Sequence, residues 1–292
     1  MIVVSLLGGM GNQMFQYALG RSLSIKYGVP LKFDVALLND RTPGQGVFRE
    51  YELELFDVTG SLASREEIPF RSRLYFTGGL RLLINRIRAR LMKNKGKEKV
   101  FGGFSPEVLS IGPNMYLEGY WQSERYFADI AENIRKDFTL KGVLPENIQN
   151  LMTEISSHRS VCVHVRRTDY VGNAFTGTLD ATYYDAGIAY LSDRGPIDRV
   201  YVFSDDIEWC RESLHLAADT FFVGSEYSGS RNEGHFELMR ACRHFIIPNS
   251  TYSWWAAWLS PNPTKIVIAP KKWFAGQTSE TDEIVPKSWI RI

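Results

Sequence analysis

The stretch Val161–Tyr170, VCVHVRRTDY, decides the class of fold. Its three alternating valines predict a buried β-strand, and polar side chains follow directly where that strand ends. In an open parallel α/β sheet, ligands bind beyond the carboxyl ends of the strands. Two adjacent arginines, Arg166 and Arg167, are costly to bury at such a place unless an anion meets them. The stretch therefore predicts a strand end that binds a phosphate-bearing ligand.

Strand-like and helix-like segments alternate through the carboxyl-terminal half of the chain. Such an alternation predicts a parallel sheet that helices cover on both faces. Polar residues follow several of the expected strands, which predicts a nucleotide-type site at one rim of that sheet. The expected strands are 161–165, 200–204, 220–224, 244–248 and 265–269, and the expected helices are 183–192, 207–217, 236–243 and 253–259.

The amino-terminal end predicts a β–loop–α–β unit. Residues 1–7 are typical of a strand, 13–27 of an amphipathic helix, and 31–35 of a second strand. Between the first strand and the helix stands GGMGNQ at 8–13, whose glycines let backbone amides approach a phosphate near the helix N-terminus. A tight turn is the simpler interpretation of these glycines, and Asn12 is suited to cap the helix.

The middle of the chain is less regular. Residues 51–56, YELELF, predict a strand, and a basic section at 71–99 holds ten Lys or Arg residues and the single acid Glu98. Within it, residues 80–92 have the spacing of an amphipathic helix. Such a helix packs its apolar stripe on its own domain, which is the commoner case, or lies on an anionic membrane surface.

Length and composition set the number of domains. The chain has 292 residues, 44% of them hydrophobic, which suffices for one large domain or two of ordinary size. The polar segment 144–159 predicts a boundary between a domain of residues 1–150 and one of residues 151–292. The formal charge of +1 gives no argument for nucleic acid, and we expect no nucleic-acid partner.

The cysteines and the first residues bear on the cellular compartment. The chain has three cysteines, Cys162, Cys210 and Cys242, and none of them forms a CxxC pair. An odd number of cysteines without a disulfide framework is typical of a reducing compartment. The opening MIVVSLL has no basic leader and is too short for a signal peptide. No apolar run approaches the length of a transmembrane helix. We therefore expect a cytoplasmic protein.

The two arginines are expected to have different roles, because neighbouring residues on a strand point to opposite sides. Arg166 shares the parity of His164, so these two side chains can line one pocket. Arg167 would then anchor the loop, and Asp169 is its expected partner. Taken alone, His164 would be a core histidine.

Two further strand ends carry polar clusters. Asp205 and Asp206 are adjacent rather than spaced as Asp-x-Asp, and no clustered ligands support a metal, so ribose binding or capping of the helix at Ile207 is expected. Ser250 and Thr251 precede an aromatic helix whose N-terminus can hold a diphosphate. The helical spacing of its tryptophans, Trp254, Trp255 and Trp258, places them in the core.

Four motifs, in their order and spacing, resemble the bacterial alpha-1,2-fucosyltransferases, which are inverting enzymes that use GDP-fucose. They are GGMGNQMFQYA at 8–18, HVRRTDY at 164–170, FSDD at 203–206 and ELMRACRHFIIPNSTYSWWAAWL at 237–259. The resemblance implies an α/β fold of GT-B type, with two Rossmann-like domains that face each other across a cleft. It implies that the amino-terminal domain holds the acceptor and the carboxyl-terminal domain the nucleotide sugar. It also implies a metal-independent reaction without a cofactor.

The implied activity is transfer of L-fucose from GDP-fucose to the 2-hydroxyl of a terminal β-galactoside in a surface glycan or oligosaccharide. Arg166 would neutralise the departing GDP, Asn12 would reach the diphosphate from the other domain, and Asp169 would complete the catalytic set. His164 would lie beside the nucleotide. The other residues implied to bind the sugar donor are Gly9, Gly11, Arg167, Ser204, Asp205, His235, Asn249, Ser250 and Thr251.

One position departs from the family pattern. Members usually carry an acid just before the apolar-x-Leu-Met run, as a partner for the N1 and N2 protons of guanine, whereas this chain has His235, with Glu233 two residues earlier. Asp169, Asp34 and Glu50 are all candidates for the general base. Pairing of Asp169 with Arg167 would lower the basicity of Asp169, so the sequence does not decide among the three.

Two alternatives stay open beside the fucosyl activity. One is an inverting transferase of the same architecture with a different nucleotide sugar or linkage, and the other is a nucleotide- or glycan-binding protein without turnover. If the acceptor is lipid-linked, the basic helix at 80–92 would hold the enzyme at the inner membrane. The sequence carries no signal for the oligomeric state.

Overall fold

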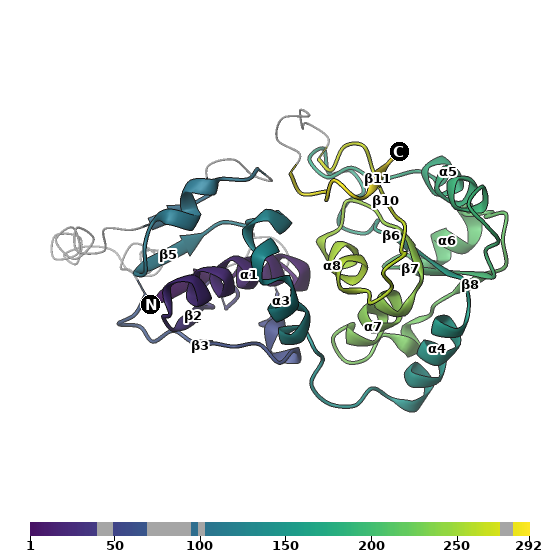
Figure 1. Cartoon of the computed structure of the whole chain (residues 1–292). Coiled ribbons are helices and arrows are strands. Elements are labelled where there is room, and N and C mark those ends of the chain that lie inside the picture. The colour runs from purple at the N-terminus through teal and green to yellow at the C-terminus, as the bar shows by residue number, and fades with distance from the viewer. Residues whose placement is uncertain (40–48, 69–94, 99–102, 275–282) are drawn as a thin grey trace. The chain divides into compact units, whose positions relative to one another are not determined.

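The chain forms two compact units, Met1–Thr139 and Leu140–Ile292 (Figure 1). The structure is a computed structural model and describes residues 1–39, 49–68, 95–98, 103–274 and 283–292. The expected basic helix at 80–92 lies outside the described residues. Whereas the sequence placed the domain boundary at residue 150, that position falls inside helix α4 (Glu146–Ser157), which belongs to the second unit.

The first unit contains a parallel sheet of five strands in the order β3-β2-β1-β5-β4, in which every neighbouring pair is parallel. The chain builds outward from β1 through β2 to β3, and then places β4 and β5 on the other side of β1. Strand order therefore reverses between β1 and β5. The strands are β1 (Ile2–Ser5), β2 (Leu31–Asp34), β3 (Ser61–Leu62), β4 (Lys95–Lys97) and β5 (Met115–Glu118).

One long helix, α1 (Met10–Tyr27), packs on this sheet. Gly20 makes the close approach possible, because a Cβ there would come within 2.5 Å of Val4 Cγ2 and 2.8 Å of Leu31 Cδ1. The helix ends, as expected, at Gly28, whose φ of 62° suits glycine. The remaining helical segments of this unit are η1 (Glu52–Leu55), η3 (Pro106–Ser110), η4 (Glu124–Tyr126), η5 (Ala128–Ile130) and α3 (Ala131–Asp137).

The expectation of a strand at residues 51–56 is wrong, because the segment forms the 3₁₀ helix η1. Its buried residues Leu53 and Phe56 are three apart, which is the period of a 3₁₀ turn rather than of a strand. The amide of Glu52 donates to the side chain of Gln13 at 2.9 Å, so it does not enter a strand ladder.

The second unit contains a six-stranded sheet in the order β11-β10-β9-β6-β7-β8, again with only parallel pairs. This confirms the predicted parallel sheet. The strands are β6 (Ser160–Val165), β7 (Arg199–Ser204), β8 (Thr220–Phe222), β9 (His244–Ile246), β10 (Val267–Ala269) and β11 (Ile290–Arg291). The helical segments are α4, α5 (Ala181–Ser192), α6 (Ile207–Ser213), η6 (Ser225–Tyr227), α7 (Glu233–Ala241) and α8 (Thr251–Leu259).

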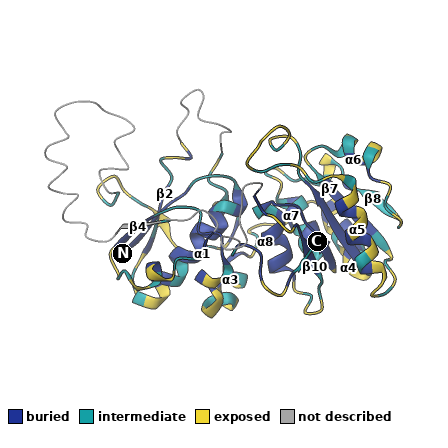
Figure 2. Cartoon of the chain, turned by 90° about the horizontal axis from the view of Figure 1, so that it is seen from above, coloured by how far each residue is buried: buried dark blue, intermediate teal, exposed yellow. Residues whose placement is uncertain are grey.

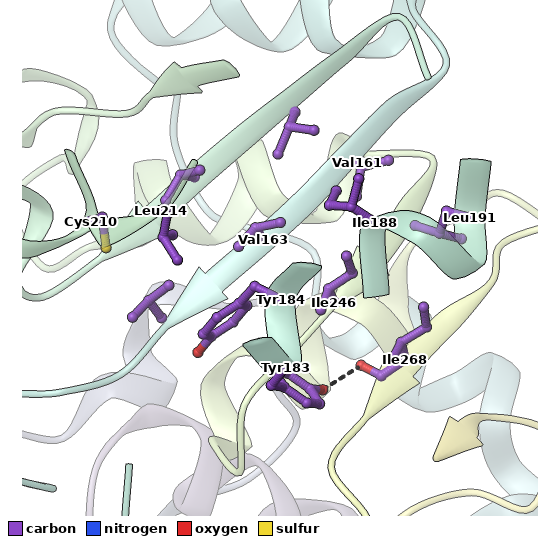
Figure 3. Close-up of a cluster of buried hydrophobic side chains, with 13 residues drawn as sticks. Val161, Val163, Tyr183, Tyr184, Ile188, Leu191, Cys210, Leu214, Ile246 and Ile268 are labelled. Atoms are coloured by element: carbon purple, nitrogen blue, oxygen red, sulfur yellow. Dashed lines mark hydrogen bonds between the residues drawn. The ribbon is translucent and has the colours of Figure 1, made fainter. Parts of the chain in front are cut away.

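Helices cover both faces of this sheet. The three valines of β6 pack on one face with side chains of α5 and α6 (Figure 3). On the other face, α7 contacts both α4 and α8, and Tyr201 of β7 donates to Glu154 of α4 at 3.0 Å. In the second sheet, the inner strands β7 and β10 are mainly buried, whereas the edge strand β8 is intermediate (Figure 2).

Large aromatic side chains fill much of the second core. Trp254, Trp255 and Trp258 are at most 7% exposed, which confirms their assignment to the core. The three cysteines are buried and free. Within the described ranges, no helix has the length and apolar character needed to cross a membrane. Membrane contact by the basic section 71–99 stays a prediction.

We expect Gly20→Ala to lower the thermal unfolding midpoint. Forcing a methyl group into this packed contact costs about 1–3 kcal/mol, and we expect this cost to exceed the gain of up to about 1 kcal/mol in helix propensity. Ser22→Ala, on a partly exposed position of the same helix, is the matched control and should leave the midpoint nearly unchanged. A Gly20→Ala protein that melts above wild type would contradict the close packing of α1 on the sheet.

Candidate active site

The second sheet reverses its strand order between β6 and β9. From β6 the chain runs outward through β7 to β8, and it then returns to place β9 on the other side of β6. In doubly wound sheets, ligands bind beyond the carboxyl ends of the strands at such a reversal. Arg166 follows β6 and Ser250 follows β9, so both lie at this point.

The two arginines point to opposite faces of the sheet, as strand parity predicts. Arg167 lies on the side of α6, where its guanidinium carbon is 3.9 Å from the centre of the Trp209 ring. His164 lies on the side of α8, with its ring 6.0 Å from that of Tyr252, and the charge of Arg166 acts on it. Arg166 Cζ lies 5.7 Å from the centre of the Tyr170 ring, and the Tyr170 hydroxyl donates to the backbone carbonyl of Asn249 just before α8, so Arg166 and His164 share one side of the strand end.

Carboxylates of the protein meet both guanidinium groups. Arg166 Nη2 lies 2.9 Å from Asp169 Oδ1, and its Nε lies 3.2 Å from Asp205 Oδ2. Arg167 Nε lies 3.3 Å from Asp206 Oδ2. The expectation that Asp169 pairs with Arg167 is thus wrong, because Asp169 lies on the Arg166 side. The sequence predicted that an anionic ligand would meet these arginines. In the structure, carboxylates of the protein supply part of that negative charge.

Asp205 fixes the loop that follows β6. Its carboxylate accepts hydrogen bonds from the backbone amides of Arg167 at 2.9 Å and Thr168 at 3.2 Å, and also from the Thr168 hydroxyl. Burial raises the pKa of Asp205, but the Thr168 hydroxyl, Arg166 and the Arg167 amide outweigh it, so the pKa lies below its ordinary value. Asp205 is therefore ionised, and its hydrogen bonds hold the loop that follows β6 in place. Its expected contact with ribose stays a prediction.

The neighbouring Asp206 caps helix α6. Its carboxylate accepts from the amide of Trp209 at 3.3 Å, which confirms the capping interpretation, and its own amide donates to Ser204 Oγ at 2.9 Å. Among the described residues, no group of three or more His, Cys, Asp or Glu side chains is arranged to hold a metal ion.

His164 is buried at the end of β6 with one unpaired nitrogen. The residue is 5% exposed, and its Nδ1 has no hydrogen-bond partner among the residues that the structure describes. Burial, followed by the charge of Arg166, lowers the pKa of His164 to about 3. The imidazole is therefore neutral at physiological pH, and it can form hydrogen bonds to a ligand without adding charge.

The segment after β9 connects the loops at this edge. The Asn249 side chain donates to Thr176 O at 2.8 Å and to Trp273 O at 3.0 Å, and the backbone carbonyl of Asn249 accepts from Tyr170 OH at 3.2 Å. Ser250 is the N-cap of α8, but its side chain makes no capping hydrogen bond. The N-terminus of α8, where Thr251 is the first residue, lies beside His164, whose ring is 6.0 Å from that of Tyr252.

His235 stands in the first turn of α7, after β8. Its Nε2 lies 2.9 Å from the carbonyl oxygen of Gly224, and its ring meets Phe203 edge to face at 5.8 Å. Glu233 is engaged elsewhere, since its carboxylate accepts from the amides of Ser230 at 3.0 Å and Arg231 at 2.7 Å. His235, rather than Glu233, therefore belongs to the strand-end cluster.

The first unit has a polar cluster at its own strand reversal. Gly9 is the N-cap of α1, so the expectation that Asn12 caps this helix is wrong. Asn12 Oδ1 accepts from Gln122 Nε2 at 2.8 Å, which joins the first turn of α1, where Gly11 also lies, to the segment after β5. Gly8 permits this geometry, because its φ is +78° and a Cβ there would lie 2.5 Å from Asn12 Nδ2.

Sequence reasoning missed three residues of these clusters. Gln122 was missed because β5 was not predicted. Thr168 lies inside a quoted motif, but its hydroxyl bond to Asp205 depends on a neighbouring strand. Arg49 carries no motif signal, yet its Nε lies 3.7 Å from the position of a Cβ on Gly9. All three residues were missed because their contacts join segments that lie far apart in the sequence.

The sequence as a whole identifies the family. Over residues 1–292 the chain matches the protein family described as Glycosyl transferase family 11. The chain belongs to this family. This family 11 protein is 33% identical to an alpha-1,2-colitosyltransferase of Escherichia coli, over 100% of this chain and 98% of that one. It is 30% identical to the mouse galactoside alpha-(1,2)-fucosyltransferase 1, over 52% of this chain and 43% of that one.

The solved structures support the fold expected for family 11. The fucosyltransferase NodZ from Bradyrhizobium superposes with a TM-score of 0.52 at 16% identity, over 89% of this chain and 92% of that one. This likeness, together with the two parallel sheets, confirms an α/β fold of GT-B type. The resemblance to the alpha-1,2-fucosyltransferases is confirmed at the level of the family.

We expect Asp205→Asn to destabilise the protein only where Asp205 is ionised. The lowered pKa means that this carboxylate stabilises the fold above about pH 4, the ordinary range of an aspartate, and that the contribution is lost as pH falls through the lowered value. At neutral pH the variant should lose about 1.5–3 kcal/mol of unfolding free energy, as for hydrogen bonds to a charged group.

Denaturation at several pH values measures this difference. Asp185→Asn, on an exposed position of α5, serves as the control and should unfold like wild type throughout. If the unfolding free energies of wild type and Asp205→Asn differ by the same amount at pH 3 and pH 7, the ionised carboxylate of Asp205 does not hold the loop.

Proposed function

We propose that the chain is an inverting glycosyltransferase that moves L-fucose from GDP-fucose to the 2-hydroxyl of a terminal β-galactoside in a surface glycan or oligosaccharide. Membership of family 11 supplies the reaction class, and the mouse relative is named for the same linkage. The observation that carries the proposal is the guanidinium of Arg166, held by Asp169 and Asp205 at the strand reversal beside His164.

In this reaction, the acceptor hydroxyl forms a bond to the anomeric carbon from the face opposite GDP, and the bond from that carbon to the diphosphate oxygen breaks. The transition state has oxocarbenium character, and negative charge develops on the departing GDP. The contacts of Arg166 with carboxylates use Nε and Nη2, so we expect Nη1 to meet the diphosphate. Backbone amides at the N-terminus of α8, with Ser250 and Thr251, would share this charge.

The other expected contacts are part of the same proposal. Asn12 and the glycine loop of the first unit would reach the diphosphate, and a metal ion or cofactor would not be required. Arg167 would act through the loop rather than on the ligand, because Asp206 and Trp209 hold its guanidinium.

The proton of the acceptor hydroxyl needs a base. His164 is too weak for this at neutral pH, with a pKa of about 3. Asp34 is 2% exposed and accepts from Tyr116 OH at 2.8 Å and from the Ala36 amide at 3.0 Å, which disfavours it. Asp169 and Glu50 remain the candidates, and Asp169 also orients Arg166.

A second sugar donor is supported by one observation. The Escherichia coli relative that aligns with the whole chain is named for colitose transfer. Colitose is fucose without its 3-hydroxyl, so the diphosphate chemistry proposed above applies to both sugars. Transfer of colitose from a GDP-linked donor is therefore the second candidate function.

We expect Arg166→Ala to lower kcat by about 10²–10³, the typical effect of losing one group that stabilises transition-state charge. Arg211→Ala, which removes an exposed guanidinium from α6, should keep wild-type turnover. Circular dichroism and thermal melting establish that both variants are folded. An Arg166→Ala enzyme with near-normal kcat would exclude Arg166 from stabilisation of the leaving group.

Release of GDP in excess EDTA tests the reaction itself. We expect GDP-fucose to be turned over only when a terminal β-galactoside is added, with a product cleaved by a fucosidase specific for the 2-linkage. Faster turnover of GDP-colitose would assign the chain to the second candidate. GDP binding with no turnover on any β-galactoside would refute both candidates and favour a binding protein.

A further inference from the structure

Two buried glutamines of α1 are fully paired with the backbone. Gln13 and Gln16 are both 0% exposed. Gln13 accepts from the amide of Glu52 at 2.9 Å and donates to the carbonyl of Gly8 at 2.9 Å. Gln16 accepts from the amide of Leu7 at 3.1 Å and donates to the carbonyl of the same residue at 3.2 Å. Both side chains therefore stabilise the fold of the first unit.

A third buried glutamine, Gln122 in the segment after β5, is paired at one end. It is 3% exposed, and its Nε2 donates to Asn12 Oδ1 at 2.8 Å. Its Oε1 is buried and has no hydrogen-bond partner within the described part of the chain. A buried acceptor without a partner destabilises a fold, and an apolar side chain of similar size would avoid that cost. The packing of the first unit thus gives no reason for a glutamine here, whereas the bond to Asn12 does.

The turn that carries Gln122 is strained and is held by a carboxylate. Trp121 has a φ of 57°, which is unfavourable for a bulky side chain. Glu98, directly after β4, accepts from the backbone amides of Tyr120 at 2.6 Å and Trp121 at 3.2 Å. Gly119 permits this approach, because a Cβ there would collide with the Glu98 side chain. Strain that the surroundings maintain in this way is typical of functional sites.

The bond from Gln122 sets the direction of the Asn12 amide. Since Oδ1 of Asn12 faces Gln122, the nitrogen of the same amide, with its two protons, faces the other way. This Nδ2 atom lies over Gly8, where a Cβ would come within 2.5 Å of it, so glycine keeps that side of the amide clear of a side chain. An NH2 group donates to the oxygens of a diphosphate, whereas an amide oxygen would repel them.

We propose that Gln122 is a positioning residue for the transfer reaction. It turns the Asn12 amide so that the NH2 group, rather than the oxygen, meets the ligand, and Glu98 holds the turn that carries Gln122. The inference rests on the proposed contact of Asn12 with the diphosphate of the sugar donor. The unpaired Oε1 of Gln122 and the strain at Trp121 then have one common cause, which is the placement of a single hydrogen-bond donor.

The variant Gln122→Met separates positioning from folding. It keeps the size of the side chain, removes the unpaired acceptor, and releases Asn12, which is partly exposed and can bond to water. We expect a thermal unfolding midpoint no lower than that of wild type. In contrast, kcat for GDP release from GDP-fucose with a β-galactoside should fall by about 10–100-fold, as when a group that orients a functional side chain is lost.

Two other glutamines supply matched controls. Gln13→Met should lower the midpoint by about 5 °C, because it leaves buried backbone groups unpaired. Gln149→Met, on an exposed position of α4, should change neither the midpoint nor kcat. A midpoint for Gln122→Met that falls as far as that of Gln13→Met would show that Gln122 serves the fold and would overturn the proposal, as would wild-type kcat in Gln122→Met.

Double variants test whether the three residues act together. With Asn12→Ala in place, Gln122→Met should lower kcat no further, because the amide that Gln122 orients is gone. Glu98→Gln replaces one accepting oxygen with an NH2 group, so it should lower kcat in wild type but have little effect in Gln122→Met. Losses that multiply independently in either pair would contradict the proposed chain of contacts.

A crystal structure of Gln122→Met gives a readout that needs no turnover. We expect the Asn12 amide to leave its wild-type orientation while the backbone of Trp121 keeps its own. An Asn12 amide that stays in place would overturn the inference whatever the reaction. The proposed function fails separately, if wild type itself releases no GDP from GDP-fucose or GDP-colitose with any β-galactoside.

Discussion

The reversal of strand order in each parallel sheet is the constraint on which the candidate site depends. At a reversal, the loops after two adjacent strands leave toward opposite faces of the sheet, so the edge between them is open to a ligand. In the second unit this edge lies between β6 and β9, and it receives His164, Arg166 and the N-terminus of α8. In the first unit it lies between β1 and β5, where Gln122 meets Asn12. The polar clusters of both units therefore follow from topology rather than from any single motif.

Both arginines at the second reversal are paired with carboxylates before a ligand arrives. Two arginines face three aspartates, and Asp205 holds both the backbone of the loop and one guanidinium. Because each guanidinium is already paired, the carboxylates hold it in place before a ligand binds. A diphosphate would then meet an oriented group rather than a flexible one, which is the condition under which electrostatic stabilisation of a transition state is effective.

Much of this arrangement could be predicted from the sequence. Alternating valines, glycine positions and strand parity predicted the second sheet, the end of α1 and the opposite directions of Arg166 and Arg167. The pairing of Asp169, the role of Thr168 and the contact of Gln122 could not be predicted, because each depends on which strands become neighbours. The segment 51–56 is a 3₁₀ helix rather than the expected strand, and the two units divide between Thr139 and Leu140 rather than within the polar segment 144–159, each for a local reason. Leu53 and Phe56 repeat with a period of three, and Ile148, Leu151 and Ile155 form a helical stripe on α4.

A crystal structure with bound GDP tests the central claim most directly, namely that the reversal between β6 and β9 holds the nucleotide. We predict the diphosphate within hydrogen-bonding distance of the Arg166 guanidinium and near the N-terminus of α8, with the base toward His235. A nucleotide bound away from this edge, with Arg166 still paired only to Asp169 and Asp205, would contradict the account.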